Sequence, residues 1–126
     1  MSLKTPLGAA RGLGSAKSGT HHWIVQRITA IALVPLTIWF VFAAIGLAGG
    51  GYAEAQAWLA APINAVLMIL LTIATFHHMQ LGLQVVIEDY IHAEGAKIAA
   101  LLAVKLGAFA LGAAAVFSIL KVAFTA

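Results

Sequence analysis

Two adjacent histidines, His77 and His78, lie in a run at 62–87 that contains no Asp, Glu, Lys or Arg. Polar groups in such a run are costly inside a membrane and therefore point to function. Consecutive helical residues point about 100° apart, so His78 shares its face with Gly82, while His77 lies beside Leu81. A macrocycle bound axially by a helical histidine needs small neighbours, and neutral imidazole suits iron. The pattern favours His78 as a haem ligand, with His77 as the second candidate and a histidine hydrogen-bonded to another helix as the alternative.

A six-coordinate haem needs a second axial ligand, and this chain offers none in a suitable place. His21, His22 and His92 are expected at the membrane boundary, whereas His78 precedes Tyr90 by twelve residues, or about 18 Å of helix rise. The second ligand is therefore expected from another chain. This makes the protein a subunit rather than a complete cytochrome.

Polar side chains also stand at the ends of the apolar runs. Arg27 suits a carboxylate such as a haem propionate, or it anchors its helix to lipid phosphate. Tyr90 offers a phenol to a quinone carbonyl, and Asp89 could orient the quinone or relay protons; an ordinary helix end is the alternative. Gln80 and Gln84, one turn apart, are expected to form interhelical hydrogen bonds.

The composition requires lipid as the solvent for most of the chain. Of 126 residues, 63% are hydrophobic and 9% are charged, far below the roughly 25% charged residues of soluble domains. There is no cysteine, which excludes disulfides, thiolate metal sites and a cysteine nucleophile. The net charge of +3 is modest, and no aromatic residues accompany the basic ones near the N-terminus, so nucleic acid is not an expected partner.

Hydropathy predicts an all-α membrane protein with three transmembrane helices at about 26–48, 62–88 and 97–124. A helix of about 20 apolar residues crosses a hydrocarbon core of about 30 Å, and each of these segments is long enough. Residues 1–22 are expected to form a cytoplasmic N-terminal arm, and residues 23–126 a single three-helix domain.

Basic residues predict the orientation of these spans. The side of the bundle that holds the N-terminus would carry five basic residues: Lys4, Arg11, Lys17, Arg27 and Lys97. The other side would carry only Lys121, near the C-terminus. The positive-inside rule therefore places the N-terminus in the cytoplasm and the C-terminus outside. The three glycines at 49–51 are expected to end the first helix, and residues 52–61 to form a short connection. Gly107 and Gly112 predict close packing of the third helix.

Two segments resemble a known family. The stretch from His78 to Tyr90 resembles the histidine–x3–glycine–x6–aspartate–tyrosine segment of the smaller hydrophobic anchor subunit of succinate dehydrogenase. In this sequence the motif consists of His78, Gly82, Asp89 and Tyr90. Residues 21–30, His-His-Trp-Ile-Val-Gln-Arg-Ile-Thr-Ala, resemble the start of the first helix in the same family.

The resemblance implies a non-catalytic subunit of a four-subunit complex in the bacterial inner membrane, in preference to the mitochondrial one. Its partners would be a flavoprotein, an iron–sulfur protein and a second membrane anchor subunit. His78 would be one axial ligand of a shared haem b, Tyr90 and Asp89 would serve the ubiquinone site, and Arg27 and His21 would contact haem propionates. The alternatives are a fumarate reductase anchor, a homodimeric b-type cytochrome, and a structural or transport protein without haem.

Overall fold

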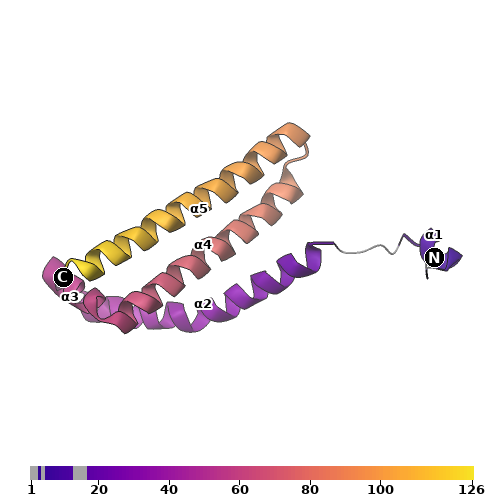
Figure 1. The fold of residues 1–126 in the computed structure, drawn as a ribbon. Coiled ribbons are helices and arrows are strands. Elements are labelled where there is room, and N and C mark those ends of the chain that lie inside the picture. Colours follow the sequence, from indigo (N-terminus) through magenta and orange to yellow (C-terminus); the bar gives the residue numbers. More distant parts are fainter. Residues whose placement is uncertain (1–2, 4, 13–16) are drawn as a thin grey trace.

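The computed structural model describes residue 3, residues 5–12 and residues 17–126, and the described part is helical without strands. Five helices follow one another along the chain (Figure 1): α1 (Pro6–Ala10), α2 (Gly19–Leu47), α3 (Tyr52–Ala60), α4 (Pro62–Tyr90) and α5 (Glu94–Phe124). Three of them, α2, α4 and α5, are long and apolar enough to cross a membrane. The predicted all-α membrane fold with three spans is confirmed.

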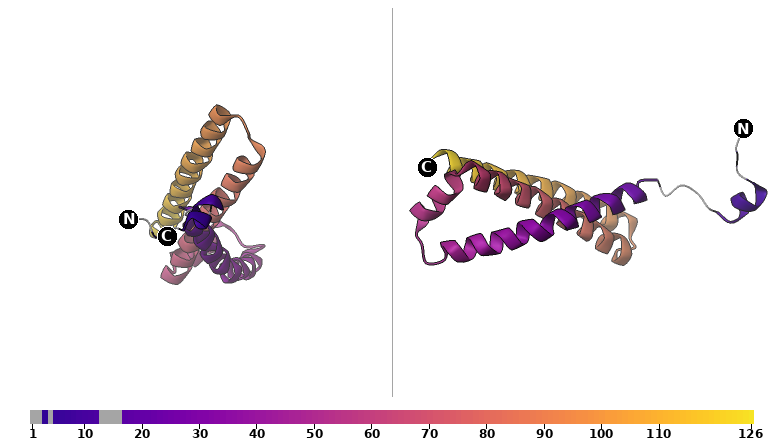
Figure 2. Two further views of the ribbon diagram at one scale, coloured as in Figure 1. Left: turned by 90° about the vertical axis from the view of Figure 1, so that its right-hand side faces the viewer. Right: turned by 90° about the horizontal axis from the view of Figure 1, so that it is seen from below.

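The central element is α4, which packs against α2 on one side and against α5 on the other. Helix α5 runs alongside α4, whereas α2 crosses α4 at an angle (Figure 2). The start of α2 and the connection between α4 and α5 lie at one end of the bundle, and α3 and the C-terminus lie at the other (Figure 1). Side chains at the start of α2 and at the end of α4, which are far apart in the sequence, therefore lie at the same end of the bundle.

The first span is longer than predicted. Helix α2 begins at Gly19 rather than near residue 26, so His21 and His22, assigned to the N-terminal arm from the sequence, lie in this helix. Hydropathy detects only the part of a helix that lies in lipid, and a helix can begin in water before it enters the membrane. The rest of the predicted arm contains the short helix α1, capped by Thr5, whose Oγ1 accepts from the amide of Gly8 at 3.0 Å. Lys4 lies outside the described residues.

The connection predicted at 52–61 is almost entirely a helix, α3, which hydropathy did not predict. Gly49 has a φ of 87° and follows α2, consistent with a glycine just past a helix end. The ring of Trp58 then stacks on Trp39 of α2, with centroids 5.6 Å apart, and the Trp58 carbonyl accepts from Asn64 Nδ2 at 2.8 Å. A nine-residue helix is marginal in isolation, so these tertiary contacts, which hydropathy does not report, stabilise it.

Few side chains are buried within the chain itself. In the described part, the buried apolar residues are Ala74, Leu81, Ile87 and Ile119, and most large apolar side chains face outward. Gly112 of α5 lies against α4, where an added Cβ would stand 3.5 Å from the Phe76 ring, an ordinary contact distance that does not require glycine. Gly107 has no such contact, since an added Cβ there would meet nothing within 4 Å.

Candidate functional site

A hydrogen bond between His78 of α4 and Thr29 of α2 joins the two helices. Thr29 Oγ1 lies 2.9 Å from His78 Nδ1. The same oxygen lies 2.9 Å from the carbonyl oxygen of Val25 and 3.0 Å from that of Gln26, one turn earlier on α2. Thr29 is the one buried polar residue in the described part of the chain, with 9% of its surface exposed. The alternative considered for His78, a hydrogen bond to another helix, is therefore observed.

That hydrogen bond occupies only one nitrogen of the His78 ring. The other nitrogen, Nε2, makes no hydrogen bond to any described residue and is not among the fully buried polar atoms. Next to it, Gly82 leaves space: an added Cβ would meet only Gln26 Nε2, at an ordinary contact distance of 3.9 Å. Packing within this chain does not require glycine at position 82. The open surface beside His78 is thus available to a group from outside the chain.

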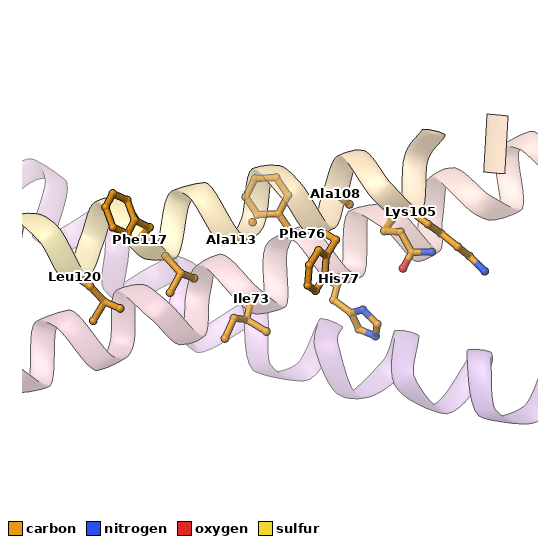
Figure 3. A pocket seen from close by; sticks show the side chains of 12 residues that line it. Ile73, Phe76, His77, Lys105, Ala108, Ala113, Phe117 and Leu120 are labelled. Carbon is orange, nitrogen blue, oxygen red and sulfur yellow. The ribbon is translucent and has the colours of Figure 1, made fainter. Parts of the chain in front are cut away.

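His77 has different surroundings, as its position 100° around the helix predicts. Its side chain is exposed and lines a groove between α4 and α5 (Figure 3). It also borders a smaller hollow between α2 and α4. The two histidines therefore point in different directions, and of the two only His78 hydrogen-bonds to a neighbouring helix.

Thr29 and Gln26 were not singled out from the sequence. With His22 they recur at i, i+4 and i+7, a spacing that places them on one face of α2. In the structure, His22 Nε2 and Gln26 Oε1 are buried and lack a hydrogen-bond partner among the described residues. This stripe of polar residues on an otherwise apolar helix was the sequence signal that could have identified them, and in the structure the stripe faces α4.

The two residues predicted to meet haem propionates, Arg27 and His21, are both exposed on α2. The guanidinium carbon of Arg27 lies 5.4 Å from the ring centroid of Trp23, within the range of a cation–π contact. Arg27 forms no ion pair with a described residue, so its charge is available to a carboxylate or a lipid phosphate. The neighbouring His22, rather than His21, turns toward the interior.

Asp89 and Tyr90 end α4 and are exposed, Tyr90 at 78%. Their side chains make no hydrogen bond to any described residue. The prediction of an interhelical bond from Gln84 is wrong, because Gln84 Nε2 donates to Glu88 Oε1 at 2.9 Å within α4. Residues four apart on a helix are neighbours, and the sequence-based prediction did not include Glu88 as a partner of Gln84. Gln80 lines the groove with His77.

The fold brings the predicted site residues to one half of the bundle. The start of α2, which carries His21 and Arg27, lies at the same end as the close of α4, which carries Asp89 and Tyr90 (Figure 1). His78 lies deeper, about 18 Å along α4 from Tyr90. Polar side chains thus extend from an exposed helix end to a histidine at membrane depth.

Comparison with known proteins places the chain in a family. The chain matches the family described as succinate dehydrogenase/fumarate reductase transmembrane subunit over residues 1–117. It is 40% identical over 97 residues to the succinate dehydrogenase hydrophobic membrane anchor subunit of Rickettsia bellii (strain RML369-C), covering 77% of this chain and 78% of the relative. The protein of the same name from Paracoccus denitrificans is 34% identical over 118 residues, covering 93% of this chain and 90% of the relative.

A more distant relative is the succinate dehydrogenase membrane anchor subunit of Reclinomonas americana, which is 28% identical over 93 residues, or 71% of this chain and 78% of the relative. The family match covers all of α2 and α4 and most of α5. With three apolar spans and nearly the whole length matched, the chain belongs to the succinate dehydrogenase/fumarate reductase transmembrane subunit family.

Proposed function

We propose that this chain, as a membrane anchor subunit of succinate dehydrogenase, supplies one axial ligand, His78, to a haem b that it shares with a second membrane anchor subunit. Such a haem takes up and releases single electrons. Tyr90 and Asp89 would serve a site for ubiquinone beside the iron–sulfur subunit, to which the flavoprotein delivers electrons from succinate. The chain alone would catalyse nothing.

The observation that carries this proposal is the contact between Thr29 and His78. The Thr29 hydroxyl has one hydrogen and lies within bonding distance of two backbone carbonyls, Val25 and Gln26. When it donates to a carbonyl, its oxygen accepts from Nδ1–H of His78. This selects the tautomer whose Nε2 carries a lone pair, and metal-binding histidines are commonly held in this way by a second hydrogen bond.

The surface around Nε2 supports a ligand shared between chains. Gly82 and Thr75 lie about one turn from His78 and present little bulk, so a flat ring can approach the helix. From the sequence, no other histidine of this chain is expected to face His78 across a ring, and the second ligand would come from the partner anchor subunit. A bis-histidine haem between two subunits would then hold them together as well as carry electrons.

At the end of the bundle, exposed side chains have the chemistry that a quinone site needs. The Tyr90 hydroxyl can donate to a quinone carbonyl, and the Asp89 carboxylate can accept a proton or orient the phenol. Arg27 and His21 stand at the same end and would meet haem propionates. We place this end at the cytoplasmic face of a bacterial inner membrane, because Arg27 and Lys97 lie there.

The test is to purify the complex through a tag on this chain, after co-expression with the three other subunits. A reduced-minus-oxidised spectrum should contain a b-type haem band. His78→Ala should abolish that band, and the matched variant His77→Ala should retain it. The control for assembly is that the flavoprotein, the iron–sulfur subunit and the second anchor subunit still co-purify with each variant.

Other outcomes separate the alternatives. Loss of haem in His77→Ala but not in His78→Ala would contradict the ligand assignment. A haem band from this chain purified alone would indicate a homodimeric cytochrome, and no haem in any complex would indicate a structural role. Comparing succinate-driven quinone reduction with quinol-driven fumarate reduction distinguishes a succinate dehydrogenase anchor from a fumarate reductase anchor.

A further inference from the structure

A groove of about 580 Å³ lies between α4 and α5 and is lined largely by apolar side chains. Its volume falls within the range of roughly 300–1,000 Å³ that is typical of small-molecule sites. Figure 3 shows it extending along the two helices, with Lys105 and His77 towards one end and Leu120 at the other. The groove is therefore elongated, with a polar end and an apolar end.

This groove does not belong to the surface proposed for haem. His77 lines the groove, whereas Gly82 and Thr75 lie about 140° and 160° around α4 from His77. The groove and the small-residue surface beside His78 thus occupy opposite faces of the layer formed by the helices. A second anchor subunit bound at His78 would therefore meet the face opposite to the groove.

The polar end of the groove carries an uncompensated positive charge. Lys105 forms no hydrogen bond or ion pair with a described residue. It lies eleven residues after Glu94, about 16 Å along α5, and therefore belongs to the half of the bundle near the α4–α5 connection. Its side chain extends away from Leu120, towards that connection (Figure 3). A lysine that extends its ammonium toward the interface in this way favours an anionic group there.

The rest of the groove has the dimensions of an alkyl chain. From Lys105 to Leu120 the axial distance is about 22 Å, more than half of a hydrocarbon core of about 30 Å. Phe109 and Phe117 project at its border and are 79% and 67% exposed. These rings prevent the close backbone approach on which helix–helix packing in membranes relies. A flexible chain can lie between them.

We propose that the groove binds an anionic phospholipid from the leaflet on the side of the α4–α5 connection. One acyl chain lies along the groove toward Leu120, and the headgroup phosphate pairs with the Lys105 ammonium. Gln80, which lines the same end, is placed to hydrogen-bond to the ester oxygens. The site is independent of haem, and it would hold a lipid on the outer face of the complex.

The experiment measures lipid retained by the intact purified complex. The complex in detergent is given equal amounts of phosphatidylglycerol and phosphatidylcholine with identical acyl chains, and bound lipid is counted by native mass spectrometry. The wild-type complex should prefer phosphatidylglycerol. Lys105→Gln should reduce that preference about fivefold, the effect of one basic residue near a membrane surface. The matched control, Lys121→Gln on the same helix but outside the groove, should leave it unchanged.

A second variant tests the alkyl part of the site. Ala113 is exposed and lines the groove, so Ala113→Phe fills the groove without disturbing buried packing and should reduce retention of both lipids. Equal retention of the two lipids by the wild type, or an unchanged preference in Lys105→Gln, would overturn the proposal. Loss of the second anchor subunit or of haem in Lys105→Gln would also overturn it, because the groove would then be a protein interface.

Discussion

Replacing Thr29 by valine removes the hydroxyl that holds His78 while preserving the shape of the side chain. In the structure that hydroxyl is buried and 2.9 Å from Nδ1 of the histidine. A donor left without its partner in a buried place costs about 1–3 kcal/mol, and each 1.4 kcal/mol is a factor of ten. The affinity for haem should therefore fall by roughly 5- to 150-fold, in line with the 10–100-fold typical of lost outer-shell partners.

The reduction potential should move in a defined direction. Donation from Nδ1–H raises the basicity of the ring, and a more basic axial ligand stabilises ferric haem. Thr29→Val should therefore raise the haem midpoint potential. Thr29→Ser keeps the hydroxyl and should behave nearly as the wild type. The assay is haem content per flavin together with a redox titration of the purified complex.

The result that would refute this reasoning is a Thr29→Val complex with normal haem content and an unchanged potential. Lower thermal stability with an unchanged potential would assign Thr29 to packing of α2 against α4 and not to orientation of the ligand. If serine failed to restore what valine removes, the methyl group of Thr29 rather than its hydroxyl would be responsible.

Three further substitutions test other parts of the structure. Tyr90→Phe should slow succinate-driven quinone reduction about tenfold with haem content unchanged, since one hydrogen bond is lost; loss of haem instead would assign Tyr90 to assembly. Gly82→Leu should lower haem occupancy while Gly82→Ala retains it, because an added Cβ meets only Gln26 Nε2 at 3.9 Å and a larger side chain would cover the surface beside His78; equal spectra would contradict that role. Trp58→Ala should lower the thermal stability of the complex by about 0.5–1.5 kcal/mol or more through loss of its stacking on Trp39, and a thermal melt of the complex measures it.

The three spans and the positions of the intramembrane polar groups could be predicted from the sequence. The solvent for these segments is lipid, and each charged residue placed in lipid raises the free energy independently of distant parts of the chain. Hydropathy along the chain therefore determines where a helix crosses the membrane. The same reasoning failed at the start of α2 and at α3 (Tyr52–Ala60), because a helix outside lipid carries no hydropathy signal. It failed at Gln84, where a neighbour on the same helix supplied the hydrogen bond.

Only the tertiary structure decided what each polar side chain meets. The sequence places His77 and His78 about 100° apart, but which of them faces α2 depends on how side chains of the two helices interlock. That packing turns His78 to Thr29 and leaves His77 at a groove with Lys105, a residue 28 positions later in the chain. Periodicity describes one helix at a time, whereas the rotation of a helix against its neighbours is determined by contacts between residues that are distant in sequence.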